Sequence, residues 1–458
     1  MINYIGLFIA VVFIALVVRL LLKDFFPQAV LLIAGIGMLL IAGFFKKGLP
    51  LAEVNSGFIF LDIFEYIKES FSKTNAGVGL MIMTIGGFVA YMDKIGASEA
   101  LVRVALKPLA VLKKYPNLAS IAVIPIGQLI FICIPSAAGF GLLLMASVFP
   151  ILVNLGVSRI AAVSIITGCT SFCIGPASVI TASAVQIAQI ETVPYFINLQ
   201  IPIAIILNLV LMVTYFFVNK YYDEKDKLHP TEVKVKPKPK EVAPGIYALL
   251  PVLPLILLLT FSGVFAIFPI KLTIETTTAM LLSLFAGLLF ELIRTKNLKA
   301  VFASFKVFLD GMGDIFKSVV TLIIVAEIFA NGLIALGFMD GLITISQSAG
   351  LGAKGIGILM TLMIFFAAIL MGSGNAAFFA FGPLIPSVAK QFGVSTTSIL
   401  LPMNLSASMG RTISPIAGVL IATAEVAGVP VMQVVKRNLI PVVTVLLTLL
   451  IYHFGLCF

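Results

Sequence analysis

Arg411 lies inside a long apolar stretch and is the one basic residue that cannot be assigned to a loop. A charge at membrane depth is costly to bury, and by default it marks a functional site. Its guanidinium can hold a carboxylate through two parallel hydrogen bonds. We therefore expect Arg411 to bind an acidic substrate. A structural ion pair is the alternative, and Glu327, in the middle of another apolar stretch, is the available partner.

The residues around Arg411 form a polar interruption, 404–415, in an otherwise apolar segment. An interrupted helix exposes backbone N–H groups, which attract anions, and carbonyl groups, which can coordinate a cation. A second polar turn, 372–375, divides the apolar segment before it. Close packing of small residues is the alternative for Gly374. The expected substrate-binding residues of this half are Ser373, Gly374, Asn375, Ser406, Ser408, Arg411, Thr412 and Ser414.

Weaker polar sites recur in the first half of the chain, and two further residues are expected to serve a coupling ion, either Na⁺ or H⁺. A lone Ser or Thr in a membrane helix often bonds only a carbonyl of its own helix, which is the alternative for the first-half residues. A structural role is the alternative for Glu327. The expected first-half substrate residues are Ser136, Thr170, Ser171 and Ser178, and the coupling-ion residues are Asn404 and Glu327.

Metal-binding and catalytic signatures are absent from the sequence. The four cysteines lie at positions 133, 169, 173 and 457, and the chain has only two histidines. A zinc site needs about four nitrogen or sulfur ligands, so we expect small buried thiols instead. There is no Walker A sequence, HExxH motif or DDxxD cluster. We therefore expect no enzyme activity and no cofactor.

The composition is that of an integral membrane protein. Of 458 residues, 60% are hydrophobic and 11% are charged, whereas soluble domains carry about 25% charged residues. So few charges cannot coat a water-facing surface, which excludes a soluble enzyme or a nucleic-acid-binding protein. The net charge of +10 is explained by basic residues that collect in cytoplasmic loops. The apolar first 22 residues are expected to be a retained helix rather than a signal peptide.

Apolar segments of about 20 residues are long enough to cross a membrane. Two other segments, 117–155 and 353–391, are nearly twice that length, and small residues interrupt each near its middle. Lipid does not tolerate broken backbone, so we predict re-entrant hairpins with protected tips; two ordinary helices with a tight turn are the alternative. The ten predicted crossings are 3–22, 26–45, 77–93, 159–190, 196–219, 246–268, 275–293, 317–337, 395–425 and 430–456.

A polar linker, 220–244, rich in Lys and Pro, divides the chain nearly in half. The same landmarks recur on both sides in the same order; Gly156-Val157-Ser158 and Gly393-Val394-Ser395, for example, follow the two hairpins. Each half, 1–219 and 245–458, is therefore predicted to run helix, helix, amphipathic surface segment, helix, connector, hairpin, broken helix, helix. Five crossings per half is an odd number, so the second repeat must be inverted, as in many secondary transporters.

The basic residues predict the orientation. With both termini periplasmic and the linker cytoplasmic, Lys and Arg favour the cytoplasmic loops by roughly three to one. The connector 94–116 is basic, whereas its counterpart 338–352 carries no basic residue. The first hairpin is therefore expected to enter from the cytoplasm and the second from outside.

The element order, the two hairpins, the GSGNAAF tip (372–378) and the NLSASMGRTISP interruption (404–415) resemble the anaerobic C4-dicarboxylate carrier family DcuC. That family lies in the ion transporter superfamily, together with the divalent-anion/sodium symporters. The resemblance covers essentially the whole chain. It implies an all-α protein with a scaffold and a transport domain, an elevator motion and a homodimer in the bacterial cytoplasmic membrane. It also implies fumarate, succinate or malate as substrate.

The chain departs from the better-known symporters of that superfamily at the hairpin tips. Those symporters carry Ser-Asn-Thr at each tip, whereas these tips read Pro135-Ser136-Ala137 and Ser373-Gly374-Asn375. The first tip has no Asn, which argues against a sodium site in the first half. Related branches carry aminobenzoyl-glutamate, basic amino acids or short-chain fatty acids, so a carrier of such acids is the second hypothesis. An ion channel is the third, because inverted halves with hairpins can also form pores.

Overall fold

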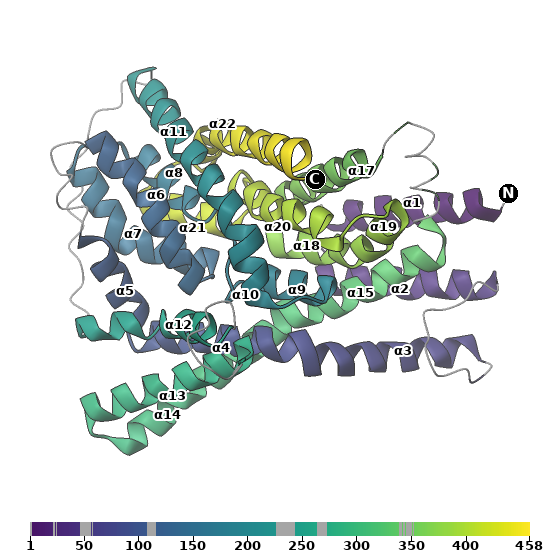
Figure 1. The fold of residues 1–458 in the computed structure, drawn as a ribbon, viewed down its shortest axis with the longest axis horizontal. Helices are drawn as coiled ribbons and strands as arrows, with labels where there is room; N and C mark the ends of the chain where they lie inside the picture. Colours follow the sequence, from purple (N-terminus) through teal and green to yellow (C-terminus); the bar gives the residue numbers. More distant parts are fainter. Residues whose placement is uncertain are drawn as a thin grey trace.

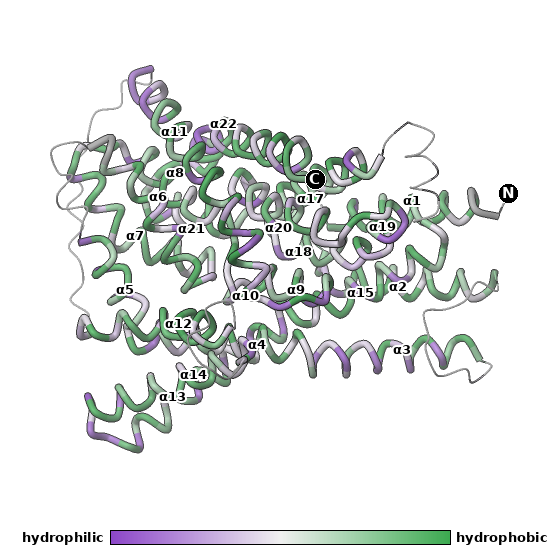
Figure 2. The backbone as a smooth tube through the Cα atoms, viewed as in Figure 1, coloured by the Kyte–Doolittle hydropathy of each residue, from purple (hydrophilic) through white to green (hydrophobic). Residues whose placement is uncertain are grey.

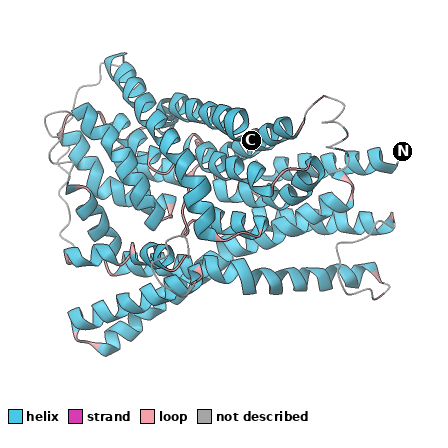
Figure 3. Ribbon diagram, in the orientation of Figure 1, coloured by secondary structure: helices cyan, strands magenta, loops and turns pink. Residues whose placement is uncertain are grey.

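The computed structural model describes residues 2–21, 23, 25–45, 56, 58–107, 116–225, 243–262, 273–338, 341, 344, 350 and 352–458. Within these residues the fold is helical throughout and contains no strand (Figure 3). The first half contains α1 (Ile2–Leu21), α2 (Pro27–Phe44), α3 (Ile59–Thr74), α4 (Leu80–Lys94), α5 (Ala97–Ala105), α6 (Pro116–Cys133), α7 (Ala137–Asn154), α8 (Arg159–Gly168), α9 (Val179–Ala188), α10 (Thr192–Pro194) and α11 (Ile201–Lys225).

The second half is also helical. A 3₁₀ turn (Gly245–Leu249) comes first, and another (Gly382–Leu384) separates α18 from α19. The helices are α12 (Leu253–Thr260), α13 (Thr276–Thr295), α14 (Leu298–Ile315), α15 (Thr321–Ala335), α17 (Ala353–Met371), α18 (Gly374–Phe381), α19 (Ile385–Phe392), α20 (Thr396–Thr412), α21 (Gly418–Ala427) and α22 (Val431–Leu450).

Both predicted hairpin segments consist of two helices joined by a short turn, and both predicted helix interruptions are present. The first hairpin is α6 and α7, and Ser136 accepts a hydrogen bond from Gly139 N to cap α7. Ser373 accepts one from Ala376 N to cap α18 in the second hairpin. The first interruption separates α8 from α9, and the second separates α20 from α21. A local polar or Pro-containing turn was therefore a sufficient signal for all four features.

The predicted amphipathic segment corresponds to α3, which ends before α4 begins. The π-helical turn Asn75–Gly79 connects the two helices with a kink, and together they form the helical span Ile59–Lys94. In the second half a π-helical turn also joins α14 and α15, giving a 38-residue helix, Leu298–Ala335. A π-helical turn keeps the backbone hydrogen-bonded while it admits an extra residue, so the amphipathic segment continues into the apolar one. Gly77 alone leaves helical geometry, with φ −98° and ψ −109°.

Two other boundaries also differ from the prediction. The expected crossing 246–268 is not one long helix over its described part, because Pro251 and Pro254 limit α12 to eight residues. The linker begins later than predicted, since α11 continues to Lys225. Residues 226–242 of the predicted linker and most of the connector 338–352 lie outside the described residues.

Eight helices in the described part of the chain are long and apolar enough to cross a membrane. They include α7 and α17, which the sequence analysis assigned to hairpins rather than to crossings. The helices are hydrophobic along most of their length, and hydrophilic residues gather at several helix ends, such as the end of α11 and the turn between α13 and α14 (Figure 2). Large side chains such as Phe8 (69% exposed) and Phe302 (69%) face outward, as expected for lipid contact.

The hairpins and interrupted helices form a group beside the long helices α3–α4 and α14–α15 (Figure 1). Within the long-helix group, α15 packs along α2 and α14 packs along α4. Within the other group, α17 packs along α20 and α11 along α22, while α18 also touches α15. Segments from both halves of the sequence therefore meet in each group.

Gly410 provides a test of the α17–α20 packing. A Cβ at Gly410 would lie 2.3 Å from the backbone oxygen of Phe365 and 2.9 Å from the Cβ of Ala368. We expect Gly410→Ala to lower the free energy of unfolding by about 1–3 kcal/mol, because helix backbones must separate. Gly418→Ala is the matched control, since a Cβ there meets nothing within 4 Å. Denaturation of both purified variants checks this, and equal midpoints would contradict the packing.

Candidate functional site

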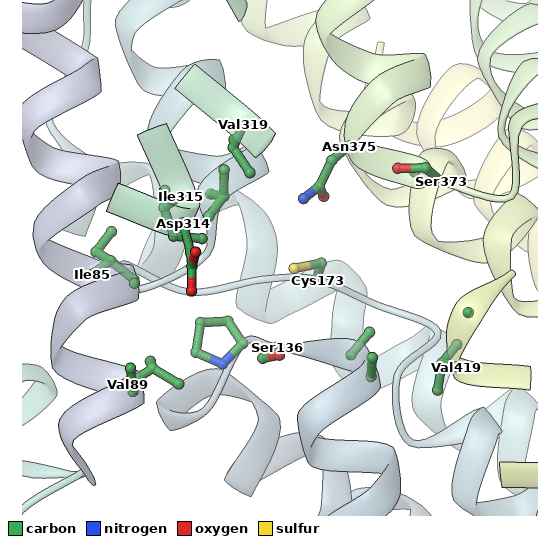
Figure 4. Close-up of a pocket in the computed structure, with 18 of the residues that line it drawn as sticks. Ile85, Val89, Ser136, Cys173, Asp314, Ile315, Val319, Ser373, Asn375 and Val419 are labelled. Atoms are coloured by element: carbon green, nitrogen blue, oxygen red, sulfur yellow. The ribbon is translucent and has the colours of Figure 1, made fainter. Parts of the chain in front are cut away.

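A cavity of about 430 Å³ lies between the two hairpin tips on one side and the long helices on the other (Figure 4). The tips, the first interruption and α20 supply its polar wall, and α4, α14 and the turn after α14 supply the opposite wall. The polar wall contains Pro135, Ser136, Ala137, Ala138, Cys173, Val179, Gly372, Ser373, Gly374, Asn375, Arg411, Gly418 and Val419. The opposite wall contains Ile85, Gly86, Val89, Ala90, Asp93, Gly311, Asp314, Ile315 and Val319.

Four helix N-termini converge on this cavity. The lining residues include the first residues of α7 (Ala137), α9 (Val179), α18 (Gly374) and α21 (Gly418). Each N-terminus leaves backbone N–H groups without partners inside its own helix and carries a partial positive charge. Interruptions and hairpin tips are what place helix starts in the middle of the protein. The arrangement is suited to an anion.

Arg411 adds a full positive charge to the same wall. It is 9% exposed, and its Nη2 donates a hydrogen bond to the carbonyl oxygen of Thr170 at the first interruption. Its Nε is buried and has no hydrogen-bond partner in the described part of the chain. A buried guanidinium with an unused donor is a costly arrangement unless a ligand or water completes it.

The alternative of an ion pair between Arg411 and Glu327 is wrong. Glu327 lies on α15 and accepts a hydrogen bond from Thr74 Oγ1 at 3.3 Å. It faces α3 and is not among the cavity-lining residues. The nearby pair Tyr66 and Asn331 bonds across the same two helices. Glu327 therefore belongs to a polar contact within the long-helix group.

The structure divides the predicted substrate residues into three sets. Ser136, Ser373, Gly374, Asn375 and Arg411 line the cavity together, although they come from three separate segments: the two hairpin tips and α20. A second set satisfies backbone carbonyls: Ser406 bonds Thr361 O, Thr412 bonds Ser408 O, Ser414 bonds Ile369 O, and Thr170 bonds Thr167 O. A third set is fully buried behind the polar wall and consists of Ser171, Ser178 and Ser408.

The buried third set still contains unused polar groups. Ser178 is engaged, because it caps α9 and contacts Cys173 Sγ at 3.2 Å. The hydroxyls of Ser171 and Ser408, however, have no hydrogen-bond partner among the described residues. The same is true of Asn404 Nδ2, while Asn404 Oδ1 accepts from Gln200. These groups lie on the first interruption and on α20, which are the segments that Arg411 and Thr170 join.

Gly374 lines the cavity and also permits close packing, so both interpretations of this residue apply. A Cβ there would lie 2.6 Å from the carbonyl oxygen of Ala407 on α20. Gly372 has φ +64°, a conformation that favours glycine, and a Cβ there would lie 2.9 Å from Ile416 O. The second hairpin tip is therefore held directly against α20 and the second interruption.

Three lining residues that carry a thiol or a carboxylate were not predicted from the sequence. Cys173 faces the cavity between the two tips, and Asp314 directs its carboxylate into it (Figure 4). Asp93 lines the same space from the end of α4. The sequence held one weak indication of Asp314, which is that small residues such as Gly311 precede it. These residues let α14 pack closely against α4, because a Cβ at Gly311 would lie 2.7 Å from Ala90 Cβ. The cavity thus holds one guanidinium and two carboxylates.

Comparisons with known proteins agree on one family. The family model for the C4-dicarboxylate anaerobic carrier DcuC matches residues 5–457. The chain is 33% identical over 452 residues to the anaerobic C4-dicarboxylate transporter DcuC of Escherichia coli K12, covering 98% of this chain and 96% of that protein. It is 34% identical over 436 residues to the probable anaerobic C4-dicarboxylate transporter DcuC of Vibrio cholerae, covering 94% and 93%.

Solved structures with the same fold are more distant in sequence. The YdaH transporter of Alcanivorax borkumensis superposes with a TM-score of 0.62 at 14% identity, covering 94% of this chain and 98% of that one. MtrF of Neisseria gonorrhoeae, described among antimetabolite efflux pumps, superposes with a TM-score of 0.59 at 14% identity, covering 96% of each chain. At this identity the likeness concerns the fold.

Proposed function

Because this chain belongs to the DcuC family of C4-dicarboxylate anaerobic carriers, we propose that it is a secondary carrier of succinate, fumarate and malate. It is a multi-pass membrane transporter of the bacterial inner membrane. The observation that carries the proposal is the convergence of four helix N-termini and the Arg411 guanidinium on one cavity. These groups provide positive electrostatic potential at the cavity.

A short dicarboxylate fits the positive and hydrogen-bonding groups of the polar wall. Arg411 would hold one carboxylate through its free donors, with its orientation fixed by Thr170 O. The second carboxylate would lie at the hairpin tips, where Ser136, Ser373 and Asn375 offer hydrogen-bond donors beside the starts of α7 and α18. The remaining predicted residues would support this wall rather than touch the substrate.

The two acids in the cavity bear on ion coupling. Asp93 and Asp314 would repel a dianion that entered alone. We therefore propose that substrate moves with cations, Na⁺ or H⁺. Asn404, with its unused Nδ2 and its Oδ1 in the buried network, stays a proposed ion residue at the core. Glu327 stays a proposed proton site, but one on the long-helix group and apart from the substrate.

The same two acids favour a second candidate, a carrier of amino acids. A zwitterion would place its carboxylate at Arg411 and its ammonium at Asp93 or Asp314. Membership of the DcuC family favours a dicarboxylate as substrate, whereas the carboxylates of Asp93 and Asp314 favour an amino acid. Competition between the two classes of substrate therefore decides between them.

We further propose that the two halves are inverted repeats and that the protein works as an elevator within a homodimer. The hairpins and interrupted helices would form the transport domain, and α2, α4, α14 and α15 would belong to the scaffold. The matching order of elements in the two halves supports this arrangement. Both termini would be periplasmic and the linker cytoplasmic, as the basic residues predict. Arg437 is a basic residue that lies buried on α22 rather than in a loop.

Counterflow in proteoliposomes tests the proposed function. Vesicles loaded with unlabelled fumarate should accumulate labelled succinate, with saturable kinetics, and malate should compete while aspartate and butyrate should not. Runs with and without a sodium gradient identify the coupling ion. Stronger competition by aspartate than by malate would favour the amino-acid carrier, and flux without saturation or counterflow would favour a channel.

A further inference from the structure

Gln200 joins three segments that meet behind the cavity. It is fully buried at the end of the π-helical turn Tyr195–Gln200, where α11 begins. Its Oε1 accepts a hydrogen bond from Gly175 N at 2.9 Å, and its Nε2 donates to Thr181 Oγ1 at 2.9 Å and to Asn404 Oδ1 at 3.2 Å. One acceptor and both donors of the amide are thus used. The side chain connects the first interruption, α9 and α20.

Asn438 makes an equivalent set of bonds from the second half. It is fully buried on α22. Its Nδ2 donates to Thr167 Oγ1 at 2.9 Å and to Thr412 O at 2.9 Å, and its Oδ1 accepts from Tyr215 OH at 3.0 Å. The side chain connects α8, the C-terminal end of α20 and α11.

The two amides form a reciprocal pair. Gln200 of the first half donates to Asn404 of the second, and Asn438 of the second half donates to Thr167 of the first. The interval between Thr167 and Asn404 equals the interval between the repeat landmarks Gly156 and Gly393. Each interrupted helix therefore receives, at the corresponding position, a bond from the opposite half of the chain.

These bonds fix the parts of the polar wall that face the cavity. Gly175, with φ +96°, lies two residues after Cys173 and packs so closely that a Cβ would be 2.6 Å from Ile132 Cγ2, next to the first hairpin tip. Thr412, whose carbonyl Asn438 holds, directly follows Arg411. Gln200 therefore holds the position of the segment that contains Cys173. Asn438 holds the position of the backbone next to Arg411. Neither amide lines the cavity.

We infer that Gln200 and Asn438 are positioning residues that hold the two interrupted helices, and with them Arg411, in register for substrate binding. The inference rests on the proposed transport function, but the bonds can also be tested without transport. Buried amides whose partners come from both halves hold the two interruptions at one fixed spacing.

The test uses Gln200→Met and Asn438→Leu in full-length protein, in the counterflow assay. We expect KM for succinate to rise about tenfold while the maximal rate falls less than about twofold, because substrate meets a displaced Arg411. Gln128→Met is the matched control: Gln128 is equally buried, but its Nε2 bonds only Gly168 O, at 3.4 Å, within the first half. Its KM should stay at the wild-type value.

A second measurement does not depend on transport. Without the Gln200 bond the first interruption loosens, so Cys173 should react with a small thiol reagent about tenfold faster in Gln200→Met, while the fully buried Cys169 on the same segment stays unreactive. If Asn438→Leu does not fold, Tyr215→Phe replaces it, and a KM rise of about threefold is expected because one bond to Asn438 is lost.

Several results would overturn the inference. They are an unchanged KM in folded variants, an equal KM rise in Gln128→Met, or equal acceleration at Cys169 and Cys173. Wild-type protein that transports no dicarboxylate would instead overturn the proposed function. In that case the Cys173 rates alone would still decide whether Gln200 holds the interruption.

Discussion

Replacing Arg411 by alanine should lower kcat/KM for succinate counterflow by about 100-fold, because charge-assisted hydrogen bonds to the substrate carboxylate are lost. The guanidinium is buried and bonded to Thr170 O, and its Nε has no hydrogen-bond partner among the described residues. Arg411→Lys keeps the charge but loses the planar fork, so it should recover only part of the rate. Initial rates over a range of succinate concentrations measure both effects.

Arg103→Ala is the matched control for this experiment. Arg103 also donates from Nη2 to a backbone carbonyl, that of Ala243, but it is exposed on α5 and lies outside the cavity. Its removal should leave KM for succinate unchanged. Wild-type kinetics in Arg411→Ala would remove Arg411 from the substrate site, and so would an equal loss in Arg103→Ala.

Cys173 provides a direct probe of binding in the same proteins. It lines the cavity that Arg411 lines, so bound succinate should slow its modification by a small thiol reagent. Replacing the exposed Cys457 by serine removes the competing surface thiol. Succinate should protect Cys173 in this background and fail to protect it when Arg411 is alanine. This comparison separates loss of binding from loss of movement.

Replacing Arg437 by alanine should lower the free energy of unfolding by about 3 kcal/mol, since it leaves a partly buried carboxylate without its partner. Arg437 is 2% exposed, and its Nη1 lies 2.6 Å from Asp223 Oδ1. Asp223 also accepts from Ser158 Oγ at 2.7 Å, and Arg437 contacts Asn219 Oδ1 at 3.3 Å. The cluster ties α22 to the end of α11. Denaturation midpoints of purified protein measure the loss.

The residue before Arg437 supplies its control. Lys436 is exposed on the same helix, and its recorded contact is with the face of the Tyr222 ring. Lys436→Ala should change stability by less than about 1 kcal/mol. Replacing both Arg437 and Asp223 by apolar residues should recover much of the stability, because no charge then remains unpaired. Equal effects of Lys436→Ala and Arg437→Ala would refute the buried ion pair.

Features with a local cause were predicted from the sequence. The hairpin tips and both helix interruptions are encoded by Pro, Gly and small polar residues that break hydrogen bonding within a few positions. The proposed repeat rests on the order of these breaks. The amphipathic α3 and the apolar α4 were predicted as separate elements, and the kink between them falls in the glycine-containing turn Asn75–Gly79. The end of α11 was misplaced because its charged last residues are compatible with either helix or linker.

From the amino-acid sequence alone it follows that this is a helical membrane protein of the DcuC family with a charged residue at a helix interruption, because these properties depend on composition and on neighbours along the chain. Only the tertiary structure decided which polar residues share the cavity. The fold places Ser136, Ser373 and Arg411 around one cavity, together with Asp93 and Asp314. It places Glu327 elsewhere, in a hydrogen bond with Thr74. Side-chain direction at such positions depends on how distant helices pack, and no local pattern records that packing.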